Sequence, residues 1–246
     1  MKKFSRLFTL CLLATFVSFS GIHARTVLII KSSKIPLLTE ERNVSGFKGI
    51  SSSGSYDLKI SMGNKESLKL EGDAETISDI ETVVENGILK IRNKSKKSWD
   101  WRSSREKVTI YVNAKSLNNI TLSGSGDISV NGIVKAEKLT NTLSGSGSIM
   151  LMADAGEYIG SISGSGKIIV SGKADQANVQ LSGSGNFDGN SFKTADAEIA
   201  ISGSGNATIN AETTLNAKVS GSGNIRYSGS AKVSQSKSGS GNIRKI

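Results

Sequence analysis

Hydrophobic and polar residues alternate along the second half of the chain, around a motif that recurs seven times. The motif is Ser-Gly-Ser-Gly, and its copies begin at Ser123, Ser144, Ser163, Ser182, Ser202, Ser220 and Ser238. The steps between copies are 21, 19, 19, 20, 18 and 18 residues. A period of this length indicates a stacked repeat, in which each unit contacts only its neighbours.

The alternation places apolar residues at fixed distances on both sides of the motif. The residue before each copy is apolar except in the last: Leu122, Leu143, Ile162, Leu181, Ile201 and Val219, then Lys237. The fifth residue after each first serine is always apolar: Ile128, Ile149, Ile168, Phe187, Ala207, Ile225 and Ile243. Alternation with a period of two is typical of half-buried strands. With 18–21 residues per coil, it predicts an all-β fold, a parallel β-helix or β-solenoid, since propeller blades are about twice as long.

The motif itself is expected to form a corner between strands, and two geometries remain open. If the strand direction continues, both glycines face inward and both serines outward. Alternatively, the glycines form a tight turn at positive φ. The residues that follow the motif are Asp127, Ser148, Lys167, Asn186, Asn206, Asn224 and Asn242. In both geometries these short polar side chains stack beside a serine stripe, and they predict a hydrogen-bonded ladder, with a ligand groove along it as the weaker hypothesis.

The first half of the chain contains a degenerate copy of the motif, Ser53-Gly54-Ser55-Tyr56. Alternating residues predict strands at 67–71, 88–92 and 108–112, whereas residues 73–83 suit a short helix or a loop. We expect residues 25–40 to form an extension and residues 41–119 to form N-terminal coils and a capping β region. Residues 120–246 are the SGSG-repeat β-helix, continuous with this cap, because an open solenoid end exposes unpaired backbone.

Residues 1–24 are predicted to be a signal peptide. A basic start with Lys2, Lys3 and Arg6 precedes an apolar run, and Ile22-His23-Ala24 offers a cleavage site. The run is too short for a transmembrane anchor, so no membrane-spanning segment is expected after the signal is removed. The protein is therefore expected in the periplasm, on the cell surface or outside the cell.

Export changes the chemistry that the chain offers. The only cysteine, Cys11, and the only histidine, His23, both lie in the signal segment. The remaining chain has no thiol, no imidazole base and no zinc site of the usual kind, and we expect no cofactor or metal. The acids after Ile120 fall at different positions relative to their motifs, so adjacent coils present no paired carboxylates. No catalytic residue is therefore assigned, and a polysaccharide-active enzyme is the least favoured hypothesis.

The chain is basic, with 31 Lys and Arg against 21 Asp and Glu. Removal of the signal leaves 28 basic and 21 acidic residues, a net charge of +7. An exported protein rarely meets nucleic acid, so none is expected as a partner. The charge suits a solvated surface or an anionic envelope polymer.

One insertion interrupts the pattern at residues 94–107. It contains both tryptophans of the chain and six basic residues, opposed only by Asp100 and Glu106. Such a segment suits stacking on sugar rings or binding of anionic polymers, and the alternative is a hairpin loop whose tryptophans fold back over the stack. The candidate ligand-binding residues are Trp99, Trp101, Arg102, Arg105, Lys96 and Lys97.

Several runs resemble one known family. They are Glu41 to Phe47, Ser53 to Leu58, Glu85 to Ile91 and the serial SGSGN motifs. The chain is similar over residues 41–246 to the putative autotransporter adhesin, head GIN domain family, common in secreted and envelope proteins of Bacteroidetes. The resemblance implies a right-handed parallel β-helix, no established catalytic residues and an adhesive role.

Three functional hypotheses follow. The leading one is a non-enzymatic, exported envelope or surface protein that binds surface polysaccharide or an envelope protein, as an adhesin does. The second is a structural envelope component that forms homo-oligomers through its coil ends. The third is a polysaccharide-active enzyme on a β-helix.

Overall fold

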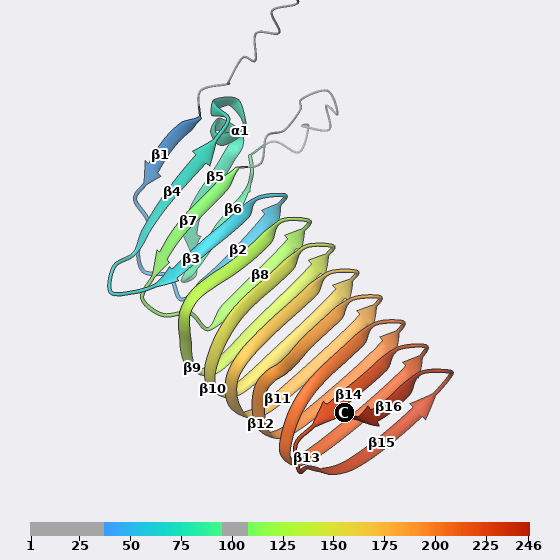
Figure 1. Cartoon of the computed structure of the whole chain (residues 1–246). Helices are drawn as coiled ribbons and strands as arrows, with labels where there is room; N and C mark the ends of the chain where they lie inside the picture. Colours follow the sequence, from blue (N-terminus) through green and yellow to red (C-terminus); the bar gives the residue numbers. More distant parts are fainter. Residues whose placement is uncertain (1–36, 95–107) are drawn as a thin grey trace, which may run out of the picture. The chain divides into compact units, whose positions relative to one another are not determined.

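The computed structural model of the chain describes residues 37–94 and 108–246. The predicted signal peptide and the six candidate residues of the insertion lie outside these ranges. Within the described part, almost every residue belongs to a strand or to the tight corner between two strands. Figure 1 shows these strands as a stack of coils.

The SGSG half forms a continuous parallel stack. Its long strands each run from one motif to the next: β9 (Asp127–Gly145), β10 (Ser148–Gly164), β11 (Lys167–Gly183), β12 (Asn186–Gly203) and β13 (Asn206–Gly221). Neighbouring strands pair in parallel, with motif opposite motif, so that Ser163 lies between Ser144 and Ser182. In Figure 1 each ribbon turns sharply at the motif and bends broadly at the opposite edge. The predicted parallel β-helix is confirmed.

Each coil contributes to two faces that enclose the core. We call the face built from the residues before each motif the pre-motif face, and the face built from the residues after it the post-motif face. The pre-motif face includes β8 (Asn119–Gly124), and the post-motif face includes β14 (Asn224–Ser228). The predicted apolar positions on both faces are buried along the stack, as with Leu181 and Ile168. Their burial against each other supplies the main stabilisation of the fold.

The corner combines the two expected geometries. The strand ends at the first glycine of the motif, and that glycine has a φ between 109° and 138° in all seven copies. The second glycine is buried and both serines are mostly exposed. The carbonyl of Gly124 accepts hydrogen bonds from the N–H groups of Ser146 and Gly147 in the next coil, at 3.0 and 3.2 Å. A Cβ on Gly183 would lie 2.7 Å from the carbonyl oxygen of Gly164, so the backbones approach too closely for any side chain here.

The coils of the first half do not stack in sequence order. β2 (Gly49–Gly54) and β3 (Asp57–Met62) form the coil with the degenerate motif. This coil pairs with β8 and β9 on one side. On the other side it pairs with β6 (Ile88–Asn93) and β7 (Thr109–Ala114), which come later in the chain.

Antiparallel strands and a short helix close the N-terminal end. β1 (Leu38–Arg42) and β4 (Ser67–Gly72) extend the post-motif face beyond β7, and β5 (Ile80–Glu85) extends the pre-motif face beyond β6. Helix α1 (Ala74–Asp79) lies between β4 and β5 in the chain and buries Ile77. The Arg42 guanidinium donates to the carbonyls of Ile77 and Ile80, at 3.1 and 2.7 Å, and so connects β1 to the helix and to β5. The predicted strands at 67–71, 88–92 and 108–112 are confirmed.

The C-terminal end has no such cover among the described residues. β15 (Lys232–Ser238) pairs with β13, and β16 (Asn242–Lys245) pairs with β14. Lys237 and Lys245 pair with Val219 and Tyr227, so they occupy core-facing positions of the last coil, and both are exposed. None of the helices in the described ranges is long and apolar enough to cross a membrane.

Candidate functional site

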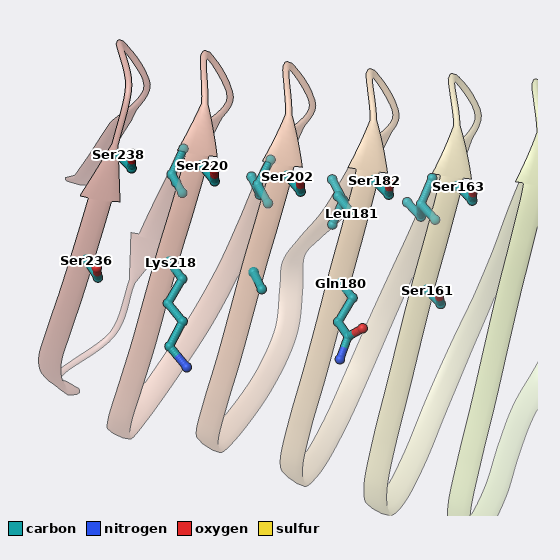
Figure 2. Close-up of a pocket in the computed structure, with 14 residues that line it drawn as sticks. Ser161, Ser163, Gln180, Leu181, Ser182, Ser202, Lys218, Ser220, Ser236 and Ser238 are labelled. Carbon is teal, nitrogen blue, oxygen red and sulfur yellow. The ribbon is translucent and has the colours of Figure 1, made fainter.

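A shallow groove of about 440 Å³ crosses several coils of the pre-motif face (Figure 2). Two rows of side chains line it. The motif serine row contains the first serine of successive motifs: Ser163, Ser182, Ser202, Ser220 and Ser238. The second row lies two residues earlier on each strand: Ser161, Gln180, Ala200, Lys218 and Ser236. Seven of these ten side chains end in a hydroxyl. The residues between the two rows, Ile162, Leu181, Ile201 and Val219, also line the groove, so its surface is mostly apolar between the rows of hydroxyls.

The parallel register produces the rows. Ser182 pairs with Ser163 and Ser202, and Gln180 pairs with Ser161 and Ala200. Parallel strands lie about 4.8 Å apart, so equivalent side chains recur at that spacing along the stack. An extended ligand along the stack axis therefore meets a motif serine and one second-row side chain at every coil.

The motif serine row is free to bind a ligand. Within the described ranges, the hydroxyls of its five groove serines make no hydrogen bond to another protein group. A hydroxyl offers one donor and two acceptor lone pairs. The row therefore presents unused hydrogen-bonding capacity to the solvent.

The asparagine ladder on the other side of the corner differs in this respect. The side-chain amide of Asn206 donates to the Asn186 side-chain oxygen at 3.1 Å. Asn224 donates to Asn206 at 2.9 Å, and Asn242 donates to Asn224 at 3.3 Å. The predicted ladder is confirmed for the four asparagines and for Ser148, which donates to Asp127 at 2.6 Å, whereas Lys167 between them pairs with Asp188 instead. Since its amides bind one another, it is less available to a ligand than the serine row.

The groove is nearly neutral. Its cation, Lys218, pairs with Glu198 at 2.8 Å, and the remaining lining groups carry no charge. The stack as a whole is balanced in the same way. Eleven of the 31 basic residues but only two of the 21 acidic ones lie outside the described ranges, which leaves 20 basic against 19 acidic side chains. The positive charge of the protein is therefore concentrated in segments other than the groove.

The insertion begins and ends at a defined place in the stack. The N–H of Asp57 donates to the carbonyl of Val108 at 3.1 Å, as the N–H of Ser148 donates to Gly126 in the regular corner. Val108 thus occupies the position of the second motif glycine. Arg92 pairs with Ser53, which continues the motif serine row. The insertion therefore replaces a corner at the N-terminal end of the same row, while Trp99, Trp101 and the four basic candidates themselves lie outside the described residues.

The groups outside the groove give little indication of catalysis. In the described ranges no cluster of three or more His, Cys, Asp or Glu side chains is placed to hold a metal ion. Burial raises the pKa of Tyr158, but this side chain lies wholly inside the core, where it accepts a hydrogen bond from Asn141 at 3.1 Å. It is therefore inaccessible to a ligand.

A second hollow, of about 610 Å³, lies at the cap beside β1, β4 and β7. Its Lys69 ammonium lies 4.5 Å from the centre of the Tyr111 ring and bonds to Glu71 at 2.6 Å. That hydrogen bond is the main reason why the pKa of Glu71 lies below its usual value. These charged groups are already paired with each other, and we assign no ligand to this hollow.

Fold and site together define a β-solenoid with an accessible groove, bordered by rows of hydroxyls, along one face. The chain belongs to the family described as putative auto-transporter adhesin, head GIN domain, whose model matches residues 46–231. This confirms the family that the sequence resembles. The family description suggests a surface or exported protein without enzymatic activity.

Solved structures share the fold. A putative adhesin from Bacteroides fragilis NCTC 9343 is 24% identical, with a TM-score of 0.81, and the match covers 85% of this chain and 97% of that one. A putative lipid binding protein from Parabacteroides distasonis ATCC 8503 is 28% identical, with a TM-score of 0.71 over 85% and 96% of the two chains. A putative adhesin from the same strain is 21% identical, with a TM-score of 0.69 over 85% and 97%. Among the curated proteins, no sequence matches this chain.

The sequence predicted the serine stripe and, as the weaker hypothesis, a ligand groove along the polar ladder beside it, but not the second row of the groove. The second row has no common residue type, since it contains serine, glutamine, alanine and lysine. Its members share only their position two residues before the motif. That offset is the signal by which the groove is recognisable in the sequence.

Proposed function

We propose that the protein is a non-enzymatic, exported binding module that holds an extended, largely uncharged polysaccharide in the groove of the pre-motif face. The observation that supports this most strongly is the motif serine row. It is a straight line of unpaired hydroxyls on a rigid stack. Hydroxyl-rich polymers present matching donors and acceptors along their length, and many weak bonds at repeated sites add up to useful avidity.

The groove is less suited to a peptide. Peptides that bind to sheets usually add a strand at an exposed backbone edge. In the groove, the backbone groups of β10 to β13 are paired with strands on both sides, whereas β15, at the end of the groove, pairs with β13 alone. Along β10 to β13 only side chains are presented, and among them charges are nearly absent. These features favour a neutral polyhydroxylated ligand over a polyanion or a strand.

End-to-end self-association, the second hypothesis, has weaker support. The open last coil offers two strand edges, but Lys237 and Lys245 occupy positions that face the core in other coils. Inward-facing charges on an edge strand are a common way to prevent edge pairing. A second copy that covered this end would have to bury both ammonium groups.

A glycan array screened with the purified chain tests the proposal. We expect binding to extended neutral glycans that persists at high salt, because hydrogen bonds to hydroxyls are less screened than ion pairs. Uniformly negative results on neutral glycans would contradict the proposal. Binding that is confined to acidic glycans and lost at high salt would instead indicate the basic insertion.

A further inference from the structure

An exposed hydrophobic cluster lies on the post-motif face, away from the groove. Ile133, Met150 and Met152 are 46%, 51% and 44% exposed. Of the large hydrophobic side chains exposed in the described ranges, these are the ones that lie within the body of the stack, whereas Leu37, Leu38 and Ile246 lie at its ends. Exposed apolar groups that are gathered in one place often mark an interaction site.

The cluster is assembled by register and not by sequence. Met152 pairs with Ile133 because the pairing shifts between Met150 and Met152, and Met150 pairs with the partly exposed Ile169. These four side chains are the methionine patch: Ile133, Met150, Met152 and Ile169. Met62, on the neighbouring strand β3, is partly buried and packs against the core.

The residue types are unusual for their positions. The outward-facing row that contains Met150 and Ile169 is otherwise polar: Lys59, Ser129, Asp188, Thr208, Arg226 and Arg244. Packing of the core does not require hydrophobic side chains at these outward positions. Methionine is flexible and polarisable, so it adapts to apolar surfaces without a fixed shape.

The form of the patch restricts its occupant. It lies on a sheet face and borders neither of the two hollows described above. Its four side chains are a small part of the roughly 20–30 residues that each partner contributes to a stable protein interface. A shallow apolar contact therefore suits the patch better than a large interface with a second copy or another folded protein.

Lysines border the patch. Lys135 follows Ile133 by two residues, Lys167 precedes Ile169 by two, and Lys59 lies one strand beyond Ser129 in the row of Met150. Nearby aspartates offset much of this charge, as in the pair of Lys167 and Asp188 at 3.4 Å. A few apolar side chains that enter the acyl region, with lysine stems reaching to the headgroups, are typical of proteins that lie on a bilayer.

We infer that the methionine patch is a docking site for a lipid bilayer surface, separate from the polysaccharide groove. The contact is chiefly apolar, because the surrounding charges nearly balance. It therefore persists when salt screens ionic attraction, unlike binding through the basic insertion.

Co-sedimentation of the purified chain with vesicles of phosphatidylethanolamine and phosphatidylglycerol tests the inference. We expect binding that survives high salt, and a loss of about tenfold or more in affinity in the double variant Met150→Ser/Met152→Ser. Ile246→Ser is the matched control, since it removes an exposed hydrophobic side chain outside the patch and is expected to bind like the wild type. Circular dichroism verifies that the variants are folded.

Three results would overturn the inference. The wild type does not bind vesicles at high salt, or the double variant binds as well as the wild type. In the third, light scattering finds a wild-type dimer that the double variant abolishes, which would make a second copy the occupant. None of these results bears on the groove, whose ligand is tested separately on glycans.

Discussion

At the scale of single residues, the glycines of the motif determine whether the coils can stack. Gly183 has a φ of 109°, and a Cβ on it would lie 2.7 Å from the carbonyl oxygen of Gly164 in the neighbouring coil. Both the left-handed backbone and the close approach exclude a side chain. This explains why the glycines recur while the residues between motifs vary.

The first prediction concerns this glycine. We expect Gly183→Ala to lower the free energy of unfolding by about 2 kcal/mol or more, since it combines backbone strain with a steric clash. Ser184→Ala, one residue further on the exposed corner, is the control and should change it by less than about 0.5 kcal/mol. Urea denaturation measures both. Equal stability of the two variants would contradict this view of the corner.

The second prediction concerns the buried pair of Asn141 and Tyr158. We expect Tyr158→Phe to cost about 1–3 kcal/mol, because it leaves the Asn141 amide buried without its partner. The double variant Asn141→Leu/Tyr158→Phe should recover much of this loss. Urea denaturation of the two single variants and the double variant measures the coupling.

The same pair has a predictable dependence on pH. Burial raises the pKa of Tyr158 in the folded state. The neutral phenol therefore stabilises the fold fully below the unfolded pKa of about 10, and this contribution is lost as the pH rises further. The stability advantage of the wild type over Tyr158→Phe should shrink above about pH 10. A stability advantage of the wild type that grows above about pH 10 would contradict the burial of Tyr158 as a neutral phenol.

At the scale of elements, the sequence predicted what repeats and could not predict what depends on distant pairing. The stacked core positions before and after each motif, such as Leu181 and Phe187, follow from a local period of two. This period can be recognised in the sequence without knowledge of the fold. The placement of β2 and β3 between strands from later in the chain cannot be predicted from the local pattern, because it depends on contacts between distant segments. The methionine patch could not be predicted for the same reason, since Ile133 and Ile169 lie 36 positions apart and are brought together by the pairing of three strands.

The third prediction belongs to the insertion. The double variant Trp99→Ala/Trp101→Ala is expected to weaken binding of an extended ligand about tenfold if the tryptophans stack on sugar rings, because the insertion begins where the motif serine row ends. Calorimetric titration with a glycan identified on the array measures the change. Unchanged affinity with intact folding would show that the insertion does not take part in binding. It would leave the groove proposal standing.

At the scale of the whole molecule, the two ends of the stack differ. The N-terminal end is covered by α1 and connected across by Arg42, whereas the C-terminal coil has core-facing Lys237 and Lys245. Equivalent positions in earlier coils hold residues such as Val219 and Tyr227. The last described coil therefore places charged residues where the coil before it places apolar and aromatic ones.

The fourth prediction follows from this difference. We expect Lys237→Leu/Lys245→Val to make the chain associate end to end, because it removes the charges that oppose pairing at the open edge. Lys232→Leu/Arg244→Val, which removes charges from exposed positions of the same two strands, is the control for a general loss of solubility. Analytical ultracentrifugation measures the oligomeric state. If Lys237→Leu/Lys245→Val remains monomeric at high concentration, these two lysines do not prevent pairing at the open edge.

The central claim is that the groove on the pre-motif face binds the ligand. Ala200 lies in the second row of the groove, and Thr208 lies in the adjoining strand on the opposite face. Ala200→Tyr fills the groove with a bulky side chain, and Thr208→Tyr places the same side chain where the groove is absent.

The most direct test is the dissociation constant of a glycan selected on the array, measured by calorimetry for the wild type and for these two variants. We predict that Ala200→Tyr raises it at least about tenfold, whereas Thr208→Tyr leaves it unchanged. Equal affinity of all three proteins, or a loss confined to Thr208→Tyr, would contradict the claim.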